Sequence, residues 1–182
     1  MSNLSFQYQD CTKTLAEGLE EYKQHVGEKY IDDTHEMKFF AAHDATHVIF
    51  GLDTSLEQEA MLDTWAIWGT DFLRQWDLVK ETFKNDQLKD LTDKFSQEFG
   101  GRFGLAKLII KLYFKVLFIK MKIFKRTFKM TKKWEYKFPK KHLNQRICDI
   151  RSEYGVTILS PEERLINNPI AVSYTHLTLP TT

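Results

Sequence analysis

One long, lysine-rich segment in the second half of the chain constrains the fold more than any other. Apolar residues recur through residues 105–134, which begin LAKLIIKLYFKVLFIK, at helical spacing, and a helix of this length is about 45 Å long. It cannot span a membrane, because Leu105 to Phe124 contains five lysines. Few runs of alternating polar and apolar residues occur elsewhere. We therefore expect an all-α fold, a single-domain helical bundle with a long basic amphipathic helix.

Basic side chains gather along one face of this helix. At about 100° per residue, they fall within about a third of its circumference, and Lys120 alone lies opposite. The residues of this stripe are Lys107, Lys111, Lys115, Lys122, Lys125, Arg126, Lys129, Lys132 and Lys133. Phe114 and Phe118 interrupt it, which favours a helix that lies on an anionic membrane surface. Each basic residue near such a surface contributes about 1 kcal/mol of attraction.

Two other interpretations of the stripe remain open. It can be the solvated face of an ordinary bundle helix. It can also bind nucleic acid phosphates. The nucleic-acid interpretation is the weakest, because residues 1–104 carry 10 basic against 20 acidic residues and no recognised nucleic-acid-binding motif accompanies the lysines. Residues 105–182 carry 16 basic against 5 acidic residues, so the two halves differ strongly in charge.

The ends of the chain bear on where the domain lies. The last residues, VSYTHLTLPTT, match one reading frame of a common sequencing adapter. We therefore expect a domain over residues 1–171, continued in the natural protein beyond Ala171, and a non-native segment over residues 172–182. The start, MSNLSFQYQD, lacks the basic and apolar regions of a secretory signal. This indicates a cytoplasmic location.

Helix boundaries can be placed from capping residues and glycines. Asp32, Asp33 or Thr34 can cap a helix that ends at Gly51, where a left-handed glycine is favoured. A capping box of Thr54 with Glu57, or of Ser55 with Gln58, predicts the start of the next helix. The expected helices cover residues 12–30, 35–50, 56–76, 105–134 and part of 144–165, with one or two polar helices over 78–98.

The stretch HDATHVIFGLDTSLEQE carries the candidate metal site. His43 and His47 are four residues apart, so both imidazoles project from one helix face. Asp44 can bind an ion or support a histidine, and the turn GLDTS folds the next helix back so that Glu59 approaches both. Zinc, iron or manganese accept this set of donors. The alternative without a metal is an amphipathic helix whose histidines face solvent. The apolar neighbours of the motif indicate burial instead, and buried polar groups need partners.

Other residues can complete this site. Glu57 can replace Glu59 as the acid, although a glutamate in the first turn of a helix is equally explained by the helix dipole. His35 or Asp63 can hydrogen-bond a ligating imidazole.

The motif resembles a known family. His-Asp-x-x-His followed by eleven residues and Glu is the signature of the coenzyme Q biosynthesis protein four family, and His43, Asp44, His47 and Glu59 match it without a gap. The segment GLDT that follows is similar to the family's Gly-x-Asp-Thr. The later IRSEYGV, residues 150–156, resembles its Arg-x-x-Tyr-Gly segment.

This resemblance implies an all-helical protein of ubiquinone biosynthesis, peripheral to the inner face of a membrane. It implies a divalent metal, zinc, held by His43, Asp44, His47 and Glu59 beside a polyprenylated quinone intermediate. The implied role is oxidative decarboxylation at C1 of the ring, or organisation of the other quinone-biosynthesis enzymes, with a homodimer as one assembly. Family members usually carry more chain ahead of the motif than the 42 residues present here.

Two alternatives stand beside the quinone hypothesis. One is a metal-dependent hydrolase in which His-Asp-x-x-His replaces the His-Glu-x-x-His of zinc peptidases, with Glu59 as third ligand. The other is a non-catalytic lipid-binding scaffold that docks through its basic helix. Trp65, Trp68 and Trp76 are expected to pack in the core, or to line a prenyl chain in either lipid-handling protein.

Overall fold

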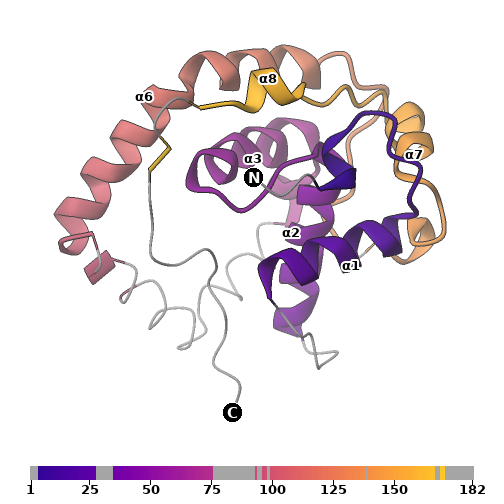
Figure 1. The fold of residues 1–182 in the computed structure, drawn as a ribbon, viewed down its shortest axis with the longest axis horizontal. Coiled ribbons are helices and arrows are strands. Elements are labelled where there is room, and N and C mark those ends of the chain that lie inside the picture. The colour runs from indigo at the N-terminus through magenta and orange to yellow at the C-terminus, as the bar shows by residue number, and fades with distance from the viewer. Residues whose placement is uncertain are drawn as a thin grey trace.

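The protein is an all-α, single-domain structure, seen here in a computed structural model (Figure 1). The structure describes residues 4–27, 35–75, 93, 96–97, 99–137, 139–166 and 169–170, with side chains from residue 41 onward in the second helix. Its α-helices are α1 (Leu15–Val26), α2 (His35–Phe50), α3 (Leu56–Gly69), α6 (Gly101–Thr127), α7 (Ile147–Tyr154) and α8 (Pro161–Arg164). Short 3-10 helices are η1 (Ser5–Gln7), η2 (Phe72–Gln75) and η3 (Lys140–His142). No strand occurs among the described residues. The expected all-α class is confirmed.

Several sequence predictions lie outside these residues. They are the cap at Asp32, Asp33 or Thr34, nearly all of the polar helices over 78–98, Trp76, and the adapter-like residues 172–182.

The first helix is shorter than expected. Thr14 caps α1 by accepting a hydrogen bond from the Glu17 N–H, while the Glu17 side chain accepts from the Thr14 N–H. This reciprocal pair fixes the start three residues later than predicted. Gly27, with φ of 79°, ends the helix.

The turn between α2 and α3 requires glycine at position 51. Gly51 has φ of 69°, as predicted for the end of this helix. A β-carbon there would lie 2.8 Å from Ile158 Cδ1 and 3.3 Å from the Phe6 carbonyl oxygen. The close packing of these segments therefore excludes any larger residue without a local shift.

Neither predicted capping box forms at the start of α3. The N-cap is Ser55, whose side chain makes no capping bond. Instead Gln58 Nε2 donates to Asp53 Oδ2 at 2.7 Å, and the Asp53 N–H donates to Gln58 Oε1 at 2.9 Å. Asp53 Oδ1 also accepts from the Ser55 N–H at 2.9 Å. Asp53 thus organises the turn, because its short carboxylate reaches backbone and side chain together.

The third helix also ends earlier than predicted, at Gly69 rather than Trp76. Beyond it the backbone pairs with a distant segment: the Trp134 N–H donates to the Gly69 carbonyl at 2.9 Å, and the Asp71 N–H donates to the Trp134 carbonyl at 3.1 Å. These tertiary bonds replace the next helical turn.

The long helix α6 packs along α3 and buries Leu112, Val116 and Ile123 against it (Figure 1). It begins four residues earlier and ends seven residues earlier than the predicted 105–134. The Thr131 N–H then donates to the Tyr154 carbonyl at 3.0 Å, so the chain leaves the helix to join α7. No helix in the described part of the chain is both long and apolar enough to cross a membrane.

The core lies where α1, α2, α3, α6 and α7 meet. Its fully buried large side chains include Trp65, Trp134, Tyr22, Phe6 and Phe50. Phe50 stacks on Trp65 with ring centroids 4.4 Å apart. Trp65 therefore packs in the core as expected, whereas Trp68 is 48% exposed and contacts Phe124 of α6.

Candidate metal centre

The α2–α3 hairpin brings three of the four predicted ligands together. Ligand atoms of His43, His47 and Glu59 all lie within 4.8 Å of one another, so this group could hold a metal ion. His47 Nε2 is 3.2 Å from Glu59 Oε1, and His43 Nε2 is 3.6 Å from Glu59 Oε2. One carboxylate thus faces both imidazoles, as the four-residue spacing and the short turn predict.

The surroundings of His47 decide which ring nitrogen is available. Its side chain is fully buried, and Nδ1 lies 3.2 Å from the Leu52 carbonyl oxygen. A carbonyl can only accept, so Nδ1 carries the hydrogen and Nε2 of the neutral ring carries a lone pair. That lone pair points to the Glu59 carboxylate, and Nε2 has no hydrogen-bond partner among the described residues. A cation between the two groups would satisfy both, which is how metal-ligating histidines are usually arranged.

An aromatic ring holds His47 from one side. Tyr22 of α1 stacks on the imidazole with centroids 5.0 Å apart and an interplanar angle of 29°. Because both rings are fully buried, the orientation of His47 is fixed by packing as well as by its bond to Leu52.

Asp44, the fourth predicted ligand, is not part of this group. It is buried, and its Oδ1 lies 3.9 Å from His43 Nδ1, whereas His43 Nε2 faces Glu59. This is the position of a carboxylate that supports a ligating histidine. Burial lowers the pKa of His43, but Asp44, Glu59 and Asp63 outweigh it, and the net pKa is raised above its ordinary value.

The group is accessible from one side. The side chains of His43 and Glu59 are 31% and 33% exposed, while His47 is fully buried. Three protein donors with an open side match catalytic zinc sites, which keep one coordination position for water or substrate.

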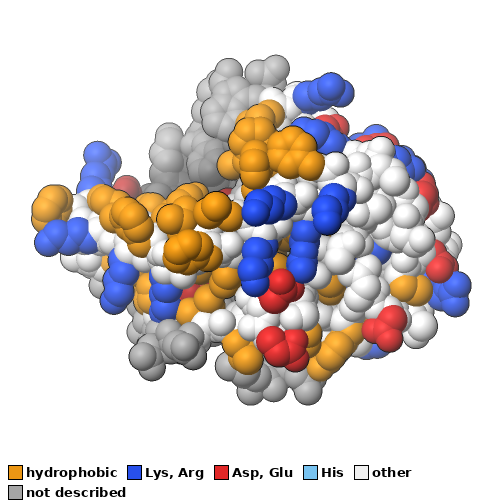
Figure 2. Space-filling view, turned by 90° about the horizontal axis from the view of Figure 1, so that it is seen from above, with side chains coloured by type: hydrophobic (Ala, Val, Ile, Leu, Met, Phe, Trp, Pro, Cys, Tyr) orange, Lys and Arg blue, Asp and Glu red, His pale blue; other side chains and the backbone are white. Residues whose placement is uncertain are grey.

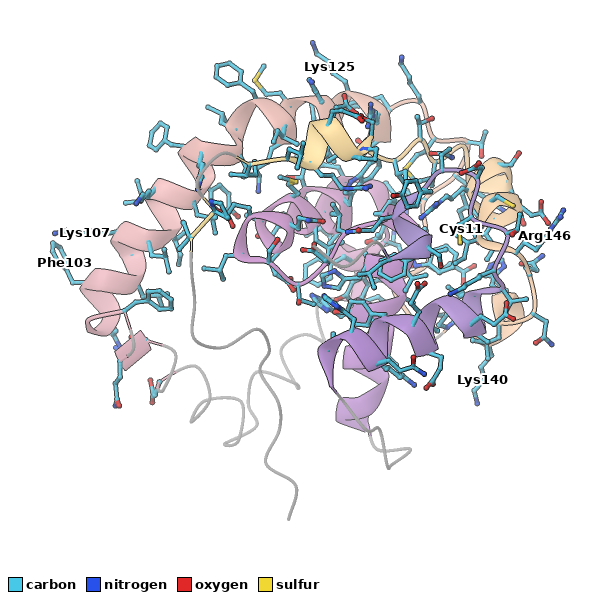
Figure 3. The ribbon with its side chains drawn as sticks, viewed as in Figure 1. Cys11, Phe103, Lys107, Lys125, Lys140 and Arg146 are labelled. Atoms are coloured by element: carbon cyan, nitrogen blue, oxygen red, sulfur yellow. The ribbon has the colours of Figure 1, made fainter. Side chains whose placement is uncertain are left out.

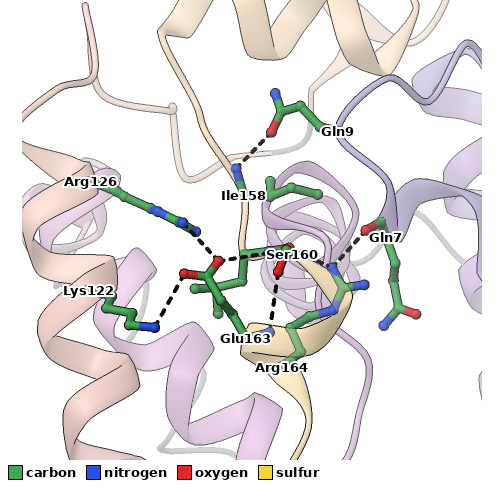
Figure 4. A network of polar contacts seen from close by, with 9 residues as sticks. Gln7, Gln9, Lys122, Arg126, Ile158, Ser160, Glu163 and Arg164 are labelled. Atoms are coloured by element: carbon green, nitrogen blue, oxygen red, sulfur yellow. Dashed lines mark hydrogen bonds and ion pairs between the residues drawn. The ribbon is translucent and has the colours of Figure 1, made fainter.

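Two buried arginines fix the end of α2, the helix that carries His43 and His47. The Arg151 guanidinium, fully buried, donates to the carbonyls of Val48 at 2.9 Å and Ile49 at 2.8 Å, and also to those of Phe6 and Tyr8. Burial lowers its pKa to about 10. Arg164 of α8 donates to the Gly51 carbonyl at 3.3 Å and to the Gln7 carbonyl at 2.7 Å (Figure 4). These bonds satisfy carbonyls that a helix end leaves unpaired.

Neither arginine was identified as a site residue from the sequence. The segment IRSEYGV was noted as a resemblance, and the structure gives Arg151 of that segment a physical role beside His47. Tyr136 was also missed. It is buried, and burial together with the negative charges of Asp44, Glu59 and Asp63 raises its pKa.

Glu57, the alternative acid, has another role. It is buried, and its Oε1 accepts from Lys115 Nζ at 2.9 Å and from the Ile170 N–H at 2.8 Å. It lies outside the group that could hold a metal ion. The side chain of His35, one suggested support for the ligands, is outside the described residues.

The basic stripe of α6 divides into two sets. Lys115 pairs with buried Glu57, and Lys122 and Arg126 pair with Glu163 of α8 at 3.4 and 2.8 Å (Figure 4). Lys132, past the end of α6, pairs with Glu153. Lys107 lies over the ring of Phe103, and these two side chains, like Lys125, point away from the core (Figure 3). Of the remaining stripe residues, Lys111, Lys125, Lys129 and Lys133 are exposed.

In comparisons with known proteins, no family model, curated protein or solved structure matches the chain.

Proposed function

We propose that the protein binds a zinc ion through His43, His47 and Glu59 and acts in ubiquinone biosynthesis on a polyprenylated ring intermediate. The observation that carries the metal part is the buried His47 Nε2, which faces the Glu59 carboxylate at 3.2 Å while Nδ1 is committed to the Leu52 carbonyl. The quinone part rests on the resemblance of the motif; that resemblance implies Asp44 as a fourth ligand, whereas we assign Asp44 a supporting position beside His43.

A bound zinc ion would supply Lewis-acid polarisation of a ring carboxylate or phenol oxygen, the chemistry expected for removal of a C1 carboxyl group. The chain's own contribution is to orient the two imidazoles, because Tyr22 stacks on His47 and the Leu52 carbonyl oxygen lies 3.2 Å from its Nδ1. The partly exposed edges of His43 and Glu59 leave room for a substrate oxygen. An organising role among other quinone-biosynthesis enzymes needs the same site for ligand binding without turnover.

A hydrolase is the second candidate, because two histidines and one glutamate are also the donors of zinc peptidases. In those enzymes the acid beside the first histidine is the general base. Here that residue is Asp44, which is buried beside Nδ1 of His43, whereas Nε2 of His43 faces Glu59. This position suits a support for the histidine better than a base that activates water, and it favours the quinone hypothesis.

We further propose that α6 docks the protein on the inner face of an anionic membrane. Four phenylalanines along and just past this helix, Phe103, Phe114, Phe118 and Phe128, are 71–78% exposed. Figure 2 shows hydrophobic side chains in a band along α6 with basic side chains beside it. Exposed aromatic rings with lysines around them are typical of interfacial helices. Lys115, Lys122, Arg126 and Lys132 are paired with carboxylates of this chain, so the docking set reduces to Lys107, Lys111, Lys125, Lys129 and Lys133.

Genetic rescue tests the quinone assignment. We expect the chain to restore quinone production in a strain lacking the family member, and Glu59→Ala to abolish that rescue. Glu162→Ala, an exposed glutamate of α8, is the matched control and should rescue normally. Extraction of the purified protein separates the alternatives, because a hydrolase carries no prenylated ring compound. Rescue by Glu59→Ala would contradict the proposal.

A further inference from the structure

Two cysteines at opposite ends of the sequence are neighbours in the structure. The Cys148 N–H, at the start of α7, donates to the Cys11 carbonyl at 3.0 Å. A backbone hydrogen bond of this kind places the two α-carbons about 5–6 Å apart. The α-carbons of disulfide-bonded cysteines are usually about 4.4–6.8 Å apart. The backbone therefore holds the two residues at a separation that a disulfide can bridge.

This contact belongs to a series of bonds that joins the chain ahead of α1 to α7. The Ile147 N–H donates to the Lys13 carbonyl at 2.9 Å, and the Leu15 N–H donates to the Gln145 carbonyl at 2.9 Å. The two segments run antiparallel. Because several bonds fix the register of these segments, Cys11 is held beside the start of α7.

The two thiols differ in their access to solvent. Cys11 is 6% exposed, whereas Cys148 is partly exposed. The Cys11 thiol contacts Ser5 Oγ at 3.9 Å, and the Cys148 thiol contacts Asp149 Oδ1 at 3.8 Å. A thiol is a weak donor, so neither contact holds its sulfur firmly. An accessible thiol beside a second, less accessible one is the usual arrangement of cysteines that respond to oxidants.

The cysteines also lie close to the arginine that holds the end of α2. Burial lowers the pKa of Arg151 to about 10, and negative charge on either cysteine opposes this effect. The same guanidinium donates to the carbonyls of Phe6 and Tyr8 ahead of Cys11, and to that of Val48 beside His47. A covalent bond from the chain ahead of α1 to α7 would therefore join Arg151 to the segment that carries two of its acceptors.

Two inert thiols that only fill space are the alternative. Buried cysteines often have that role, and it explains Cys11. It does not explain Cys148, whose side chain is partly exposed and lies directly beside the backbone of the other cysteine.

We propose that Cys11 and Cys148 form a reversible disulfide when the protein meets a peroxide. The Cys148 thiolate attacks one oxygen of hydrogen peroxide, the O–O bond breaks, and hydroxide leaves and takes up the thiol proton as water. Cys148 is then a sulfenic acid. The Cys11 sulfur attacks the Cys148 sulfur, the S–O bond breaks, and hydroxide leaves with the Cys11 proton as a second water. Two thiols have lost two electrons, and one peroxide has been reduced to two waters.

A dithiol reverses this reaction by thiol–disulfide exchange, becoming a disulfide itself. The cytoplasmic location expected from the sequence favours such a transient bond over a permanent one.

Thiol counting on the purified full chain tests the pair. The reduced protein should show two reactive thiols after denaturation. A small molar excess of hydrogen peroxide should leave none, with a mass loss of two hydrogen atoms and no dimer on a non-reducing gel. Dithiothreitol should restore both thiols. Because the new bond constrains the unfolded chain, the urea midpoint of the oxidised protein should lie above that of the reduced protein.

A variant with one thiol moved is the matched control. Cys148→Ser combined with Lys125→Cys keeps two cysteines, but Lys125 lies at the outer surface of α6, away from Cys11 (Figure 3). Peroxide at the same concentration should form no intramolecular disulfide in this variant and should leave its urea midpoint unchanged. In Cys11→Ala, the sulfenic acid of Cys148 should persist and react with dimedone.

Four results would overturn the proposal. They are wild-type thiols that survive peroxide, a disulfide between two chains, a sulfenic acid that persists on Cys148 while Cys11 stays reduced, and an intramolecular disulfide in the control variant. The wild-type measurements need no substitution, so they stand even if a variant fails to fold. No reading depends on zinc, so the outcome is independent of the metal assignment.

Discussion

His47 Nε2 of α2 and Glu59 Oε1 of α3 approach within 3.2 Å, while His47 Nδ1 faces the Leu52 carbonyl oxygen. Neither group can donate a hydrogen bond when the histidine is neutral. In that case the two groups repel each other, and a cation between them makes the contact attractive.

This relationship predicts opposite effects of one substitution in two states. Glu59→Gln should leave the metal-free protein as stable as the wild type or slightly more stable, because the amide can donate to His47 Nε2. Zinc should raise the free energy of unfolding of the wild type by about 2.7 kcal/mol at 100 times the dissociation constant, and that of the variant by almost nothing. Chemical denaturation with zinc and with chelator measures both. Equal stabilisation of the two proteins would count against a ligand role for Glu59.

The raised pKa of His43 predicts the pH dependence of zinc binding. Protons compete with the metal for this imidazole, and Asp44 and Glu59 stabilise its protonated form. Affinity should therefore begin to fall at a pH above the ordinary histidine value of about 6.5. In the metal-free protein the same shift stabilises the fold at low pH, and this contribution is lost as the pH rises through the raised pKa. Competition with a chromogenic chelator from pH 8 to pH 6 measures the fall in zinc affinity. A constant affinity over that range would be incompatible with His43 as a ligand.

Arg151 should be the most sensitive position outside the metal centre. Arg151→Met would leave the carbonyls of Val48, Ile49, Phe6 and Tyr8 buried without their donor. Each such loss costs about 1–3 kcal/mol, so we expect the free energy of unfolding to fall by at least about 3 kcal/mol. Arg146→Met is the matched control in the same segment. Its side chain is exposed and, among the described residues, forms an ion pair with exposed Asp149, so its cost should stay below about 1 kcal/mol. Urea denaturation of both variants measures these losses. Similar losses of unfolding free energy in the two variants would refute this role of Arg151.

The division of the α6 stripe predicts which residues affect membrane binding. Replacing Phe114 and Phe118 together with Ser should abolish flotation with vesicles that contain anionic lipid, because both rings are more than 70% exposed. Lys115→Met should float normally but lose about 3–5 kcal/mol of stability, since it leaves the buried Glu57 carboxylate without its cation. Failure of the wild-type protein to float would remove the membrane proposal, and flotation of the double Phe variant would remove this surface from it.

The hairpin and its three converging residues followed from local patterns. Four-residue spacing puts His43 and His47 on one face, and a left-handed Gly51 ends α2, so a short turn must bring Glu59 back beside them. Those signals lie within seventeen residues of one another. Asp44 was the exception, because spacing alone does not distinguish a ligand from the group that supports one.

The contacts between distant segments could not be derived in this way. Arg151 binds backbone carbonyls more than a hundred residues away. Every residue has a backbone carbonyl, so the sequence does not show which ones an arginine will bind. Helical periodicity placed Lys115 in the basic stripe, but only the position of α3 shows that Glu57 lies beside it. The early end of α6 likewise depends on the bond from Thr131 to Tyr154, which no local propensity encodes.

The metal content of the purified protein is the direct test of zinc binding by His43, His47 and Glu59. Elemental analysis, followed by titration of the chelator-treated protein with zinc, should give one tightly bound ion per chain, and His47→Ala and Glu59→Gln should each reduce it to background while His25→Ala, a histidine outside the centre, retains it. A wild-type protein that takes up no zinc, or a His47→Ala variant that binds zinc as tightly as the wild type, would contradict the account.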